Sequence, residues 1–378
     1  MSYNQLIRYE TGTLAANQNV GSIVAGITDF VAVGSTGACG VCVDYSGNIF
    51  ISDSVDHVVM KCDRSGAVVL VAGLAGTHGN NGSNTVTGAN ARFNAPQGLC
   101  CDHSGNLYIA DTGNHQIRVL DTNNNVSIVA GDPSAHYGYV DGANLDARFN
   151  NPHDIAVDSS GYIYVADGSN HAIRIIRGAQ VFTIAGNGTS GNLPADYSTR
   201  SQGTAARFHT PLGVSVNRSG QVFVADSGNH KVKIIQPDGW VYNFSGSGAS
   251  GTTVADAPTS QYQNLRFMDI DRSGSVYVVD YSTGGATSRL VKIALNGTPG
   301  VVIDFNATEG NYVTSVAVDQ SGALYLTESV TDLQASSSSN SSSSTILKSS
   351  SSSTASSASS KSSSSTAAKS SSSSSTAF

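Results

Sequence analysis

Short apolar runs separated by polar turns fill most of this chain, and their pattern repeats. Six times an apolar run ends at Asp or Asn, a Ser-Gly pair follows, and a second apolar run carries an aromatic ring. The copies are DYSGNIFISD, DHSGNLYIAD, DSSGYIYVAD, NRSGQVFVAD, DRSGSVYVVD and DQSGALYLTE. Their glycines stand at positions 47, 105, 161, 220, 274 and 322. Repetition at such a period indicates one supersecondary unit per copy.

Each repeat predicts four strands. The first apolar run is followed by a tight turn in which Gly takes a positive φ. The second strand is apolar on both faces, so it needs cover on both sides. A third strand follows an Asn-His pair, as in NHQIRVL and NHAIRII, and a fourth ends in sequences such as VSIVAG. Blades stacked around a central channel supply this environment, so we predict an all-β, six-bladed β-propeller of four-stranded antiparallel blades.

The repeated motifs also resemble those of a known family. The combination of A-R-F-N-x-P-x-G, G-N-h-Y-h-A-D, G-N-H-x-I-R and V-x-x-h-A-G, where h is apolar, resembles the NHL-repeat β-propeller family over residues 20–330. Blades two to four match this pattern closely, whereas blade five lacks the Asn-His pair and the proline. The resemblance implies the propeller fold and implies no single function, because function depends on sites grafted onto a fold.

The sixth repeat ends after two strands, so the ring needs strands from elsewhere. The segment NQLIR (residues 4–8) is similar to the third strand of other repeats, and VGSIVAG (20–26) is similar to the fourth. We therefore predict that residues 1–26 supply the outer strands of the last blade within a domain of residues 1–335. The alternative third strand is TILK (345–348).

Residues 336–378 change abruptly to serine, threonine, alanine and a few lysines. Such a segment buries too little apolar area to offset the entropy of ordering. We interpret it as a linker or tail, with a glycosylated stalk, a docking arm or partly placeholder serines as alternatives.

Charge and hydropathy narrow the classes of partner. The chain carries a net charge of −7, and its serine-rich end contains three lysines and no acid, so residues 1–335 are more acidic still. Nucleic-acid affinity rests on Lys and Arg that neutralise phosphates, so we predict no nucleic-acid partner. No apolar stretch is long enough for membrane insertion, and no secretory signal is visible at the amino terminus. The composition favours an extracellular or virion-surface location, and we expect the five cysteines to be reduced and buried.

Two sets of residues could carry chemistry at the channel mouth. Acids end the second strand of each repeat, and Asp111, Asp167 and Asp226 could together bind a hard cation. An acid in every repeat more commonly accepts hydrogen bonds in its own loop, so we favour that role and predict no cofactor. His57, His115, His171 and His230 recur in the same loops, and we interpret them as loop staples.

The second set breaks the repeat on the channel-lining strands. His153, Asp154 and Asp269 replace residues of other types at equivalent positions. The scaffold resembles that of the propeller lyases that process amidated peptides, which hold zinc with several histidines near the channel. Here one of six equivalent positions is histidine, which falls short of the three ligands that catalytic zinc needs. A hydrolase or lyase at the channel mouth is therefore the alternative function. Cys39 and Cys42 form a C-x-x-C pair on a strand, where residues three apart face opposite sides.

Four loops of 18–22 residues (74–93, 132–149, 187–208 and 247–264) each join a fourth strand to the next blade, so we expect all four to project from one face. Long loops in compact domains are commonly functional. Candidate binding residues there are Tyr137, Tyr139, Tyr197, His78, His136, Arg92, Arg148 and Arg207. The opposite face has short turns, which we expect to offer little to a partner.

We therefore predict a non-enzymatic binding or structural module that presents this face to a protein or glycan. An oligomer or larger assembly is compatible with this prediction. An RNA-binding NHL propeller is a further alternative, which the charge disfavours.

Overall fold

The computed structural model describes residues 3–9, 22–23, 38–63, 67–82, 84–194, 197–281, 288–305 and 311–330. The chain divides into two units, Met1–Ala335 and Ser336–Phe378, and all described residues belong to the first. The serine-rich segment and the TILK segment lie outside the described residues.

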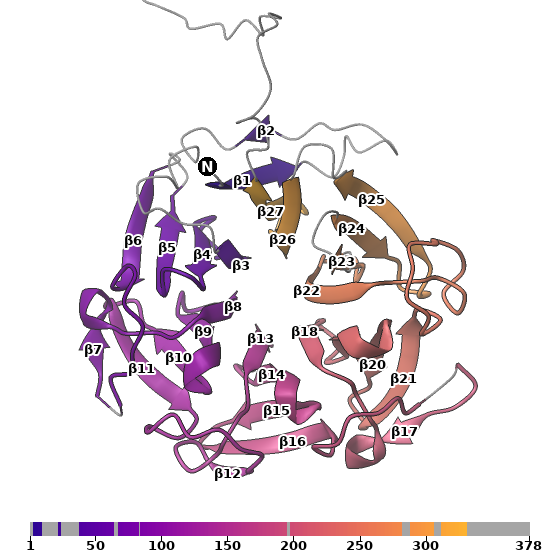
Figure 1. Ribbon diagram of the computed structural model, residues 1–378, viewed down its shortest axis with the longest axis horizontal. Helices are drawn as coiled ribbons and strands as arrows, with labels where there is room; N and C mark the ends of the chain where they lie inside the picture. The colour runs from indigo at the N-terminus through magenta and orange to yellow at the C-terminus, as the bar shows by residue number, and fades with distance from the viewer. Residues whose placement is uncertain are drawn as a thin grey trace, which may run out of the picture. The chain divides into compact units, whose positions relative to one another are not determined.

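The described residues form six antiparallel sheets, which we call blades one to six, around a central channel (Figure 1). Blade one contains β3 (Ala38–Val43), β4 (Ile49–Asp53), β5 (Val58–Cys62) and β6 (Val68–Gly73). Blade two contains β8 (Pro96–Cys101), β9 (Leu107–Asp111), β10 (Gln116–Leu120) and β11 (Asn125–Ala130). Blade three contains β13 (Pro152–Val157), β14 (Ile163–Asp167), β15 (Ala172–Arg177) and β16 (Gln180–Gly186).

The remaining three blades follow the same plan. Blade four contains β18 (Pro211–Val216), β19 (Val222–Asp226), β20 (Lys231–Ile235) and β21 (Trp240–Ser245). Blade five contains β22 (Asn264–Ile270), β23 (Val276–Tyr281), β24 (Ser288–Ile293) and β25 (Pro299–Phe305). Blade six contains β26 (Asn311–Val318), β27 (Leu324–Val330), β1 (Tyr3–Tyr9) and β2 (Ser22–Ile23). The predicted all-β propeller of four-stranded antiparallel blades is confirmed.

The hydrophobic core lies between neighbouring blades. Tyr164 of β14 shares one buried cluster with Val214 and Val224 of the next blade. Phe223 of β19 in turn packs with Met268 and Val278 of blade five. The second strand of each blade is therefore covered on both faces, which explains why its sequence is apolar throughout.

Blade six is completed by the other end of the propeller chain. Strand β1 pairs antiparallel with β27, with Leu6 opposite Thr327, and β2 pairs with β1. Leu6 is fully buried in a cluster that also holds Ala323 and Tyr325. This is the closure that the similarity of NQLIR to a third strand predicts.

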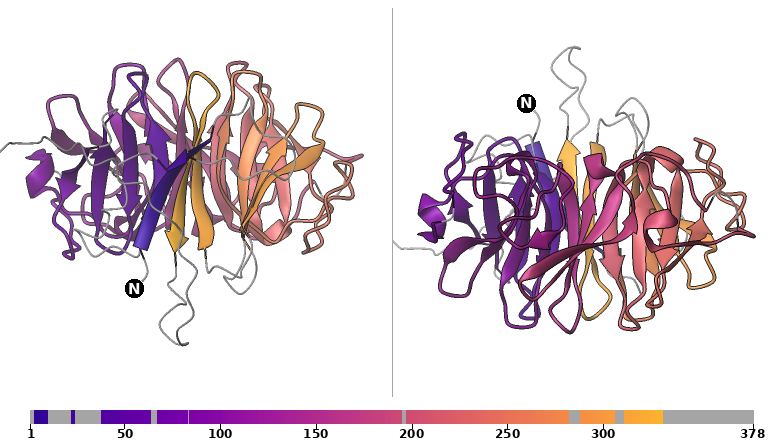
Figure 2. Two further views of the ribbon diagram at one scale, coloured as in Figure 1. Left: turned by 90° about the horizontal axis from the view of Figure 1, so that it is seen from above. Right: turned by 90° about the horizontal axis from the view of Figure 1, so that it is seen from below.

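The two faces of the propeller differ in their connections (Figure 2). The loop face carries the connections from second to third strands and the ends of the long loops. The turn face carries the D-x-S-G turns and the turns between third and fourth strands.

The prediction that all four long loops simply project from the loop face is wrong for three of them. Short strands β7 (Val86–Thr87), β12 (Gly142–Ala143) and β17 (Ser201–Gln202) pair with the outer strands β11, β16 and β21. The N–H of Gly88 donates to the carbonyl of Asn124, which lies in a turn on the turn face. Each loop thus runs along the outer edge of the next blade, where it satisfies backbone groups that an exposed edge would leave unpaired.

Candidate functional site

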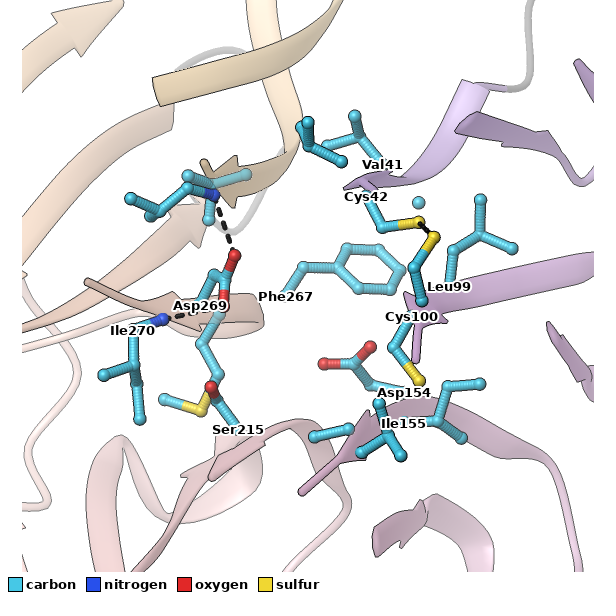
Figure 3. Close-up of a pocket in the computed structure, with 18 of the residues that line it drawn as sticks. Val41, Cys42, Leu99, Cys100, Asp154, Ile155, Ser215, Phe267, Asp269 and Ile270 are labelled. Atoms are coloured by element: carbon cyan, nitrogen blue, oxygen red, sulfur yellow. Dashed lines mark hydrogen bonds between the residues drawn. The ribbon is translucent and has the colours of Figure 1, made fainter. Parts of the chain in front are cut away.

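The innermost strands line a central channel that contains a small cavity of 180 Å³ (Figure 3). Asp154 and Asp269 both line it, together with Cys42, Cys100 and Phe267. At Gly98 a Cβ atom would lie 2.6 Å from the Cα of Asp154 on the next blade. The close approach of neighbouring inner strands therefore requires glycine there.

His153 lies outside this cavity lining and is buried between blades. Its Nδ1 lies 2.7 Å from the carbonyl oxygen of Leu212, and its ring packs against Phe267 at 4.9 Å between centroids. Burial, aided by the positive charge of Arg266, lowers the pKa of His153 to about 3. The imidazole is therefore neutral at pH 7, and its Nδ1–H donates to that carbonyl.

Asp154 and Asp269 each bind the backbone of the following blade. The Oδ2 atom of Asp154 accepts the N–H of Val214 at 3.0 Å, and Oδ2 of Asp269 accepts that of Val318 at 2.7 Å. Burial raises the pKa of Asp154, and it raises that of Asp269 to about 6. Among the described residues, no hydrogen bond joins His153 to either carboxylate, so the three predicted residues do not form a general-base arrangement.

Two cysteines meet across a blade boundary. The Sγ atoms of Cys42 on β3 and Cys101 on β8 lie 3.1 Å apart, and Cys39 instead contacts the hydroxyl of Ser54. Burial raises the pKa of the Cys42 thiol well above its usual value. The C-x-x-C pair is therefore not a unit in the fold, and its second cysteine packs against the neighbouring blade.

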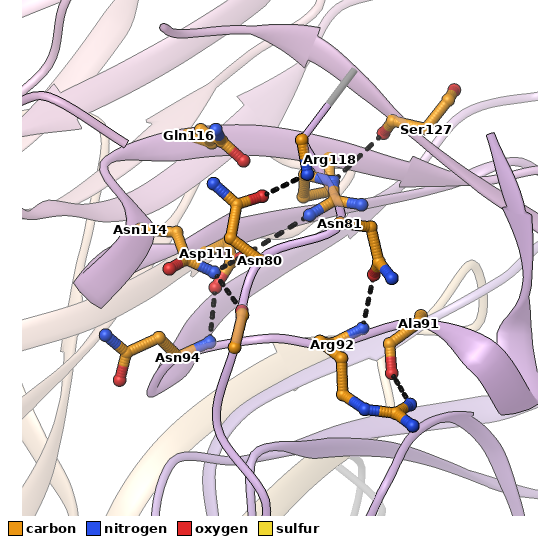
Figure 4. Close-up of polar contacts among 12 residues, drawn as sticks. Asn80, Asn81, Ala91, Arg92, Asn94, Asp111, Asn114, Gln116, Arg118 and Ser127 are labelled. Carbon is orange, nitrogen blue, oxygen red and sulfur yellow. Dashed lines mark hydrogen bonds and ion pairs between the residues drawn. The ribbon is translucent and has the colours of Figure 1, made fainter. Parts of the chain in front are cut away.

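The three acids considered as metal ligands are fully buried and paired within their own blades, and Figure 4 shows Asp111 of blade two with its partners. Each forms an ion pair with a buried cation on the third strand of its blade. The pairs are Asp111–Arg118 at 3.4 Å, Asp167–Arg174 at 2.8 Å and Asp226–Lys233 at 2.9 Å. Burial raises the pKa of Asp111 and Asp167 to about 6, against the opposing effect of these cations. The carboxylates therefore serve their own loops, as we favoured for an acid present in every repeat.

Two of these cations, Arg174 and Lys233, also hold the long loop that precedes their blade, whereas Arg118 donates to the carbonyl of Ser127 on β11. Arg174 donates to the carbonyls of Val140 at 2.7 Å and Arg148 at 3.0 Å, which stand on the two legs of that loop. Lys233 reaches the carbonyls of Leu193 and Arg207 in the same way. The sequence contains a signal for this contact, namely an Arg or Lys between apolar residues of the third strand. The alternation of polar and apolar residues alone would place such a side chain at the protein surface.

A buried phenylalanine of the A-R-F motif completes this unit. The guanidinium of Arg174 lies 5.2 Å from the ring centroid of Phe149, and the ammonium of Lys233 lies 5.1 Å from that of Phe208. Cations over aromatic faces are attracted more strongly when both are desolvated. The three-part unit of acid, cation and phenylalanine therefore fixes the base of the loops before blades three and four.

The repeated histidines and the A-R-F arginines are also engaged. Nδ1 of His115 accepts the N–H of Asn151 at 3.1 Å, and that of His171 accepts Thr210 at 3.0 Å, so each histidine links adjacent blades as a staple. Arg207 donates to three carbonyls of its own loop, including that of Ala206 at 2.9 Å. Arg92 similarly contacts the carbonyl of Ala91, and Arg148 lies 3.5 Å from Asp132.

The remaining predicted binding residues are exposed on the loop face. Tyr137 is 66% exposed, Tyr139 38% and Tyr197 37%, and His78 and His136 are also exposed. Tyr197 donates to the carbonyl of Ala257 at 2.7 Å, and Tyr139 lies over Arg174 at 5.2 Å. These two rings are therefore held in place, whereas Tyr137 touches its surroundings at the edge of the His115 ring, 5.6 Å between centroids.

Equivalent loops place different residues at the same point. The glycines 79, 138, 191 and 251 each donate an N–H to the carbonyl of a buried aromatic residue in the returning leg. On either side of them stand His78 and Asn80, Tyr137 and Tyr139, Ser190 and Asn192, and Ser250 and Thr252. The loop before blade three alone among these four carries aromatic rings on both sides. Departure from the repeat at a shared backbone position marks this loop as the strongest binding candidate.

The described part of the chain contains neither a cluster of metal-binding side chains nor a membrane-spanning helix. No group of three or more His, Cys, Asp or Glu residues there could hold a metal ion. No helix within the described ranges is long and apolar enough to span a membrane.

Comparison with known proteins places these repeats in a family. The NHL repeat model matches residues 93–120, 149–176 and 208–235, which cover the first three strands of blades two, three and four. NHL repeat-containing protein 2 of Bos taurus is 26% identical over 198 residues, covering 49% of this chain and 27% of that protein. Protein SUPPRESSOR OF QUENCHING 1, chloroplastic, of Arabidopsis thaliana is 28% identical over 220 residues, covering 55% of this chain and 20% of that protein.

The chain thus spans about a quarter of the length of the curated relatives it matches. Among solved structures, a gluconolactonase from Xanthomonas campestris aligns with a TM-score of 0.51 at 14% identity, covering 78% of this chain and 86% of that one. At that identity the likeness shows the fold alone.

Proposed function

From the premise that this chain is an NHL-repeat β-propeller, we propose that it is a non-enzymatic binding module. Its loop face, centred on the loop before blade three, docks on a protein or a glycan. We take the six sheets as one ring closed by the amino-terminal strands, and a cell or virion surface as its setting.

The observation that carries this proposal is the way buried cations hold the long loops. Arg174 bonds both legs of the loop before blade three while its charge is paired with Asp167. A surface that is already ordered loses little conformational entropy when a partner binds, so more of the contact energy appears as affinity. Three loops built this way, before blades three, four and five, supply a rigid platform.

The chemistry of the candidate loop suits a protein or glycan surface. Tyr137 and Tyr139 offer flat amphipathic rings, and Val140 beside them is 42% exposed. Arg148 pairs with Val140 across the loop and has a side chain that is 45% exposed. Aromatic residues and arginine are the residues most often found at binding hot spots.

The alternatives lack comparable support. The three candidate catalytic residues form hydrogen bonds to backbone groups of neighbouring blades; they are His153, Asp154 and Asp269. An RNA-binding role would need a basic face, and the net charge of −7 disfavours it.

A binding screen with matched tyrosine variants tests the proposal. The purified chain is applied to a printed glycan panel and to a panel of extracellular protein domains. For any ligand found, the dissociation constant is measured for the wild type and for Tyr137→Ala. Loss of an exposed hot-spot ring should weaken binding by about tenfold or more. Tyr139→Phe keeps the packing over Arg174 and should weaken binding less.

The matched control is Tyr45→Ala, which removes a ring that is 47% exposed on the turn face. It should leave loop-face binding unchanged. A ligand whose affinity falls with Tyr45→Ala and not with Tyr137→Ala would show that the loop face is the wrong surface.

A further inference from the structure

The six D-x-S-G turns surround a second, larger cavity, of 840 Å³, at the mouth of the channel on the turn face. The second residue of this motif varies between repeats, with only arginine occurring twice, and all six such residues line the cavity. They are Tyr45, His103, Ser159, Arg218, Arg272 and Gln320. The volume lies within the range of about 300 to 1,000 Å³ that is typical of ligand pockets. Short turns therefore surround an open cavity of ligand-pocket size on the face that we expect to offer little to a partner.

The turn backbone does not depend on these variable side chains. In blade two, Oδ1 of Asp102 accepts the N–H of Ser104 at 2.8 Å and that of Asn106 at 2.9 Å. The other five turns repeat this pair of bonds from their own Asp or Asn. The fold thus fixes the first, third and fourth residues of the motif and leaves the second available for another role.

Two of the variable residues are arginines on adjacent blades, and both are exposed. Arg272 donates through Nε to Oε1 of Gln320 at 2.9 Å. Arg218 makes no side-chain hydrogen bond or ion pair within the part of the chain that the structure describes. Burial raises the pKa of Tyr45, and the positive charges of Arg218 and Arg272 oppose that rise. Both guanidinium groups therefore act across the mouth, on a side chain of blade one.

Acids at the rim limit how much negative charge the mouth accepts. Asp158 and Asp271 line the cavity, and their oxygens bind donors of their own turns and of a tyrosine on the second strand. Although burial acts the other way, hydrogen bonds from Ser273 and Ser275 keep the pKa of Asp271 below its usual value. The Asp271 carboxylate is therefore ionised, and although Lys292 lies 3.5 Å from it, its negative charge at the rim makes a singly charged carboxylate a better partner for the two arginines than a doubly charged phosphate.

An aromatic pair faces the arginines from blades one and two. The rings of Tyr45 and His103 lie 4.0 Å apart between centroids at an angle of 31°, and Tyr45 is 47% exposed. A partly exposed, stacked aromatic ring offers a flat apolar face with a polar edge. Such a face suits the ring of a sugar or of another flat ligand.

We propose that the turn-face mouth binds a small, ring-bearing carboxylate of the sugar-acid class. Arg218 and Arg272 hold the carboxylate, and the ring lies against Tyr45 and His103. This site is on the face opposite the proposed docking loops. The experiment that tests it therefore does not depend on whether the loop face binds a partner.

The test is a titration of the full chain, followed by calorimetry and by amide chemical shifts, with glucuronate and galacturonate. Glucose and galactose serve as matched neutral sugars, and glucose 6-phosphate as the doubly charged comparison. We expect at least one sugar acid to bind with a dissociation constant of about 1 mM or below and at least about tenfold more tightly than its neutral match. The largest shifts should fall on the D-x-S-G turns.

Arg218→Gln and Arg272→Gln should each weaken that binding by about tenfold. Arg177→Gln removes an exposed arginine outside the cavity, at the end of β15, and should have no effect, as should Tyr137→Ala on the loop face. Unchanged thermal midpoints show that all four variants are folded. Equal binding of acid and neutral sugar, no binding of either acid, tighter binding of the phosphate, or insensitivity to both arginine variants would overturn the proposal.

Discussion

Blades three and six have the same strand order, but one position on the third strand holds a buried cation in blade three and an apolar residue in blade six. In blade three, Arg174 stands opposite Val165 and is buried with Asp167. In blade six, the equivalent register position is Ile7, opposite Leu326. The connections that precede the two blades differ in length. Residues 132–149 form the long loop before blade three, whereas only residues 306–310 connect β25 to β26 before blade six.

The difference shows what the buried cation is for. Blades two to five follow long loops and have Arg118, Arg174, Lys233 and Arg289 on their third strands. Arg289 binds the carbonyls of Thr252 and Gln261, as Arg174 and Lys233 bind their own loops. A buried ion pair adds little net stability over an apolar replacement. Where there is no long loop to hold, the position is apolar.

Placing a charge at Leu6, the buried neighbour of Ile7 on β1, should have the largest effect. Leu6→Asp places a carboxylate among Ala38, Ala323 and Tyr325 without a partner. We expect a loss of about 5 kcal/mol in the free energy of unfolding, or failure to fold. Denaturant unfolding measures this loss. Leu6→Met, which nearly conserves volume, should cost less than about 1.5 kcal/mol. Tolerance of the aspartate would mean that β1 does not close the ring.

Removing the charge of blade three should come next. Arg174→Met leaves Asp167 buried without its cation and releases both legs of the loop. The expected loss is about 3 to 4 kcal/mol, measured by denaturant unfolding, with faster amide exchange in residues 132–149. The double variant Arg174→Met/Asp167→Asn should recover part of the loss, because the uncompensated charge is gone. A single variant as stable as the wild type would contradict the role of the cation.

The channel carboxylate of blade five should give a smaller, pH-dependent effect. Burial raises the pKa of Asp269 to about 6, from an ordinary value of 3.8. Because the folded state then holds the proton more tightly than the unfolded state, this group stabilises the fold fully below about pH 4, and the contribution is lost as the pH rises through about 6. We expect a loss of about 1 kcal/mol, since the side chain is only partly covered.

Unfolding free energies of the wild type and of Asp269→Asn, measured from pH 4 to pH 7, isolate this contribution. The advantage of the wild type over the variant should shrink as the pH rises. A constant difference, or one that grows with pH, would show that Asp269 is not protonated in this range.

The smallest effect should come from the serine-rich segment. Deleting residues 336–378 should change the unfolding free energy by less than about 0.5 kcal/mol, because blade six takes its third strand from β1. Thermal or denaturant unfolding gives the value. A marked loss with this deletion, but none on deleting 350–378, would support the TILK alternative.

The sequence predicts the repeated parts of this molecule well. The six D-x-S-G copies fix the blade plan, and the similarity of NQLIR to NHQIR identifies β1 as a closing strand. These succeed because backbone turns and strand alternation depend on neighbours along the chain. The structural role of the recurring acids can also be predicted, because Asp111 and Asp167 accept hydrogen bonds from their own loops.

Features that depend on neighbouring blades escaped prediction. The meeting of Cys42 with Cys101 requires two strands far apart in the chain to lie side by side. Edge strands such as β7 have two residues, too few for any period to appear. Arg174 alternates like an exposed residue, and only the ring of Phe149 beneath it and the loop above it explain its burial. The mouth on the turn face needs six separate turns to converge.

The pairing of β1 with β27 also has a consequence for the order in which the chain folds. Arg8 and Tyr325, which hydrogen-bond across this pair, are 317 residues apart in the sequence. During synthesis β1 emerges before blades one to five, and its partner β27 emerges after them. Contacts of such long range form late, because the chain must first pay their loop-closure entropy. The leading strand therefore waits unpaired, with Leu6 exposed, and ring closure becomes a late step that chaperones would need to protect.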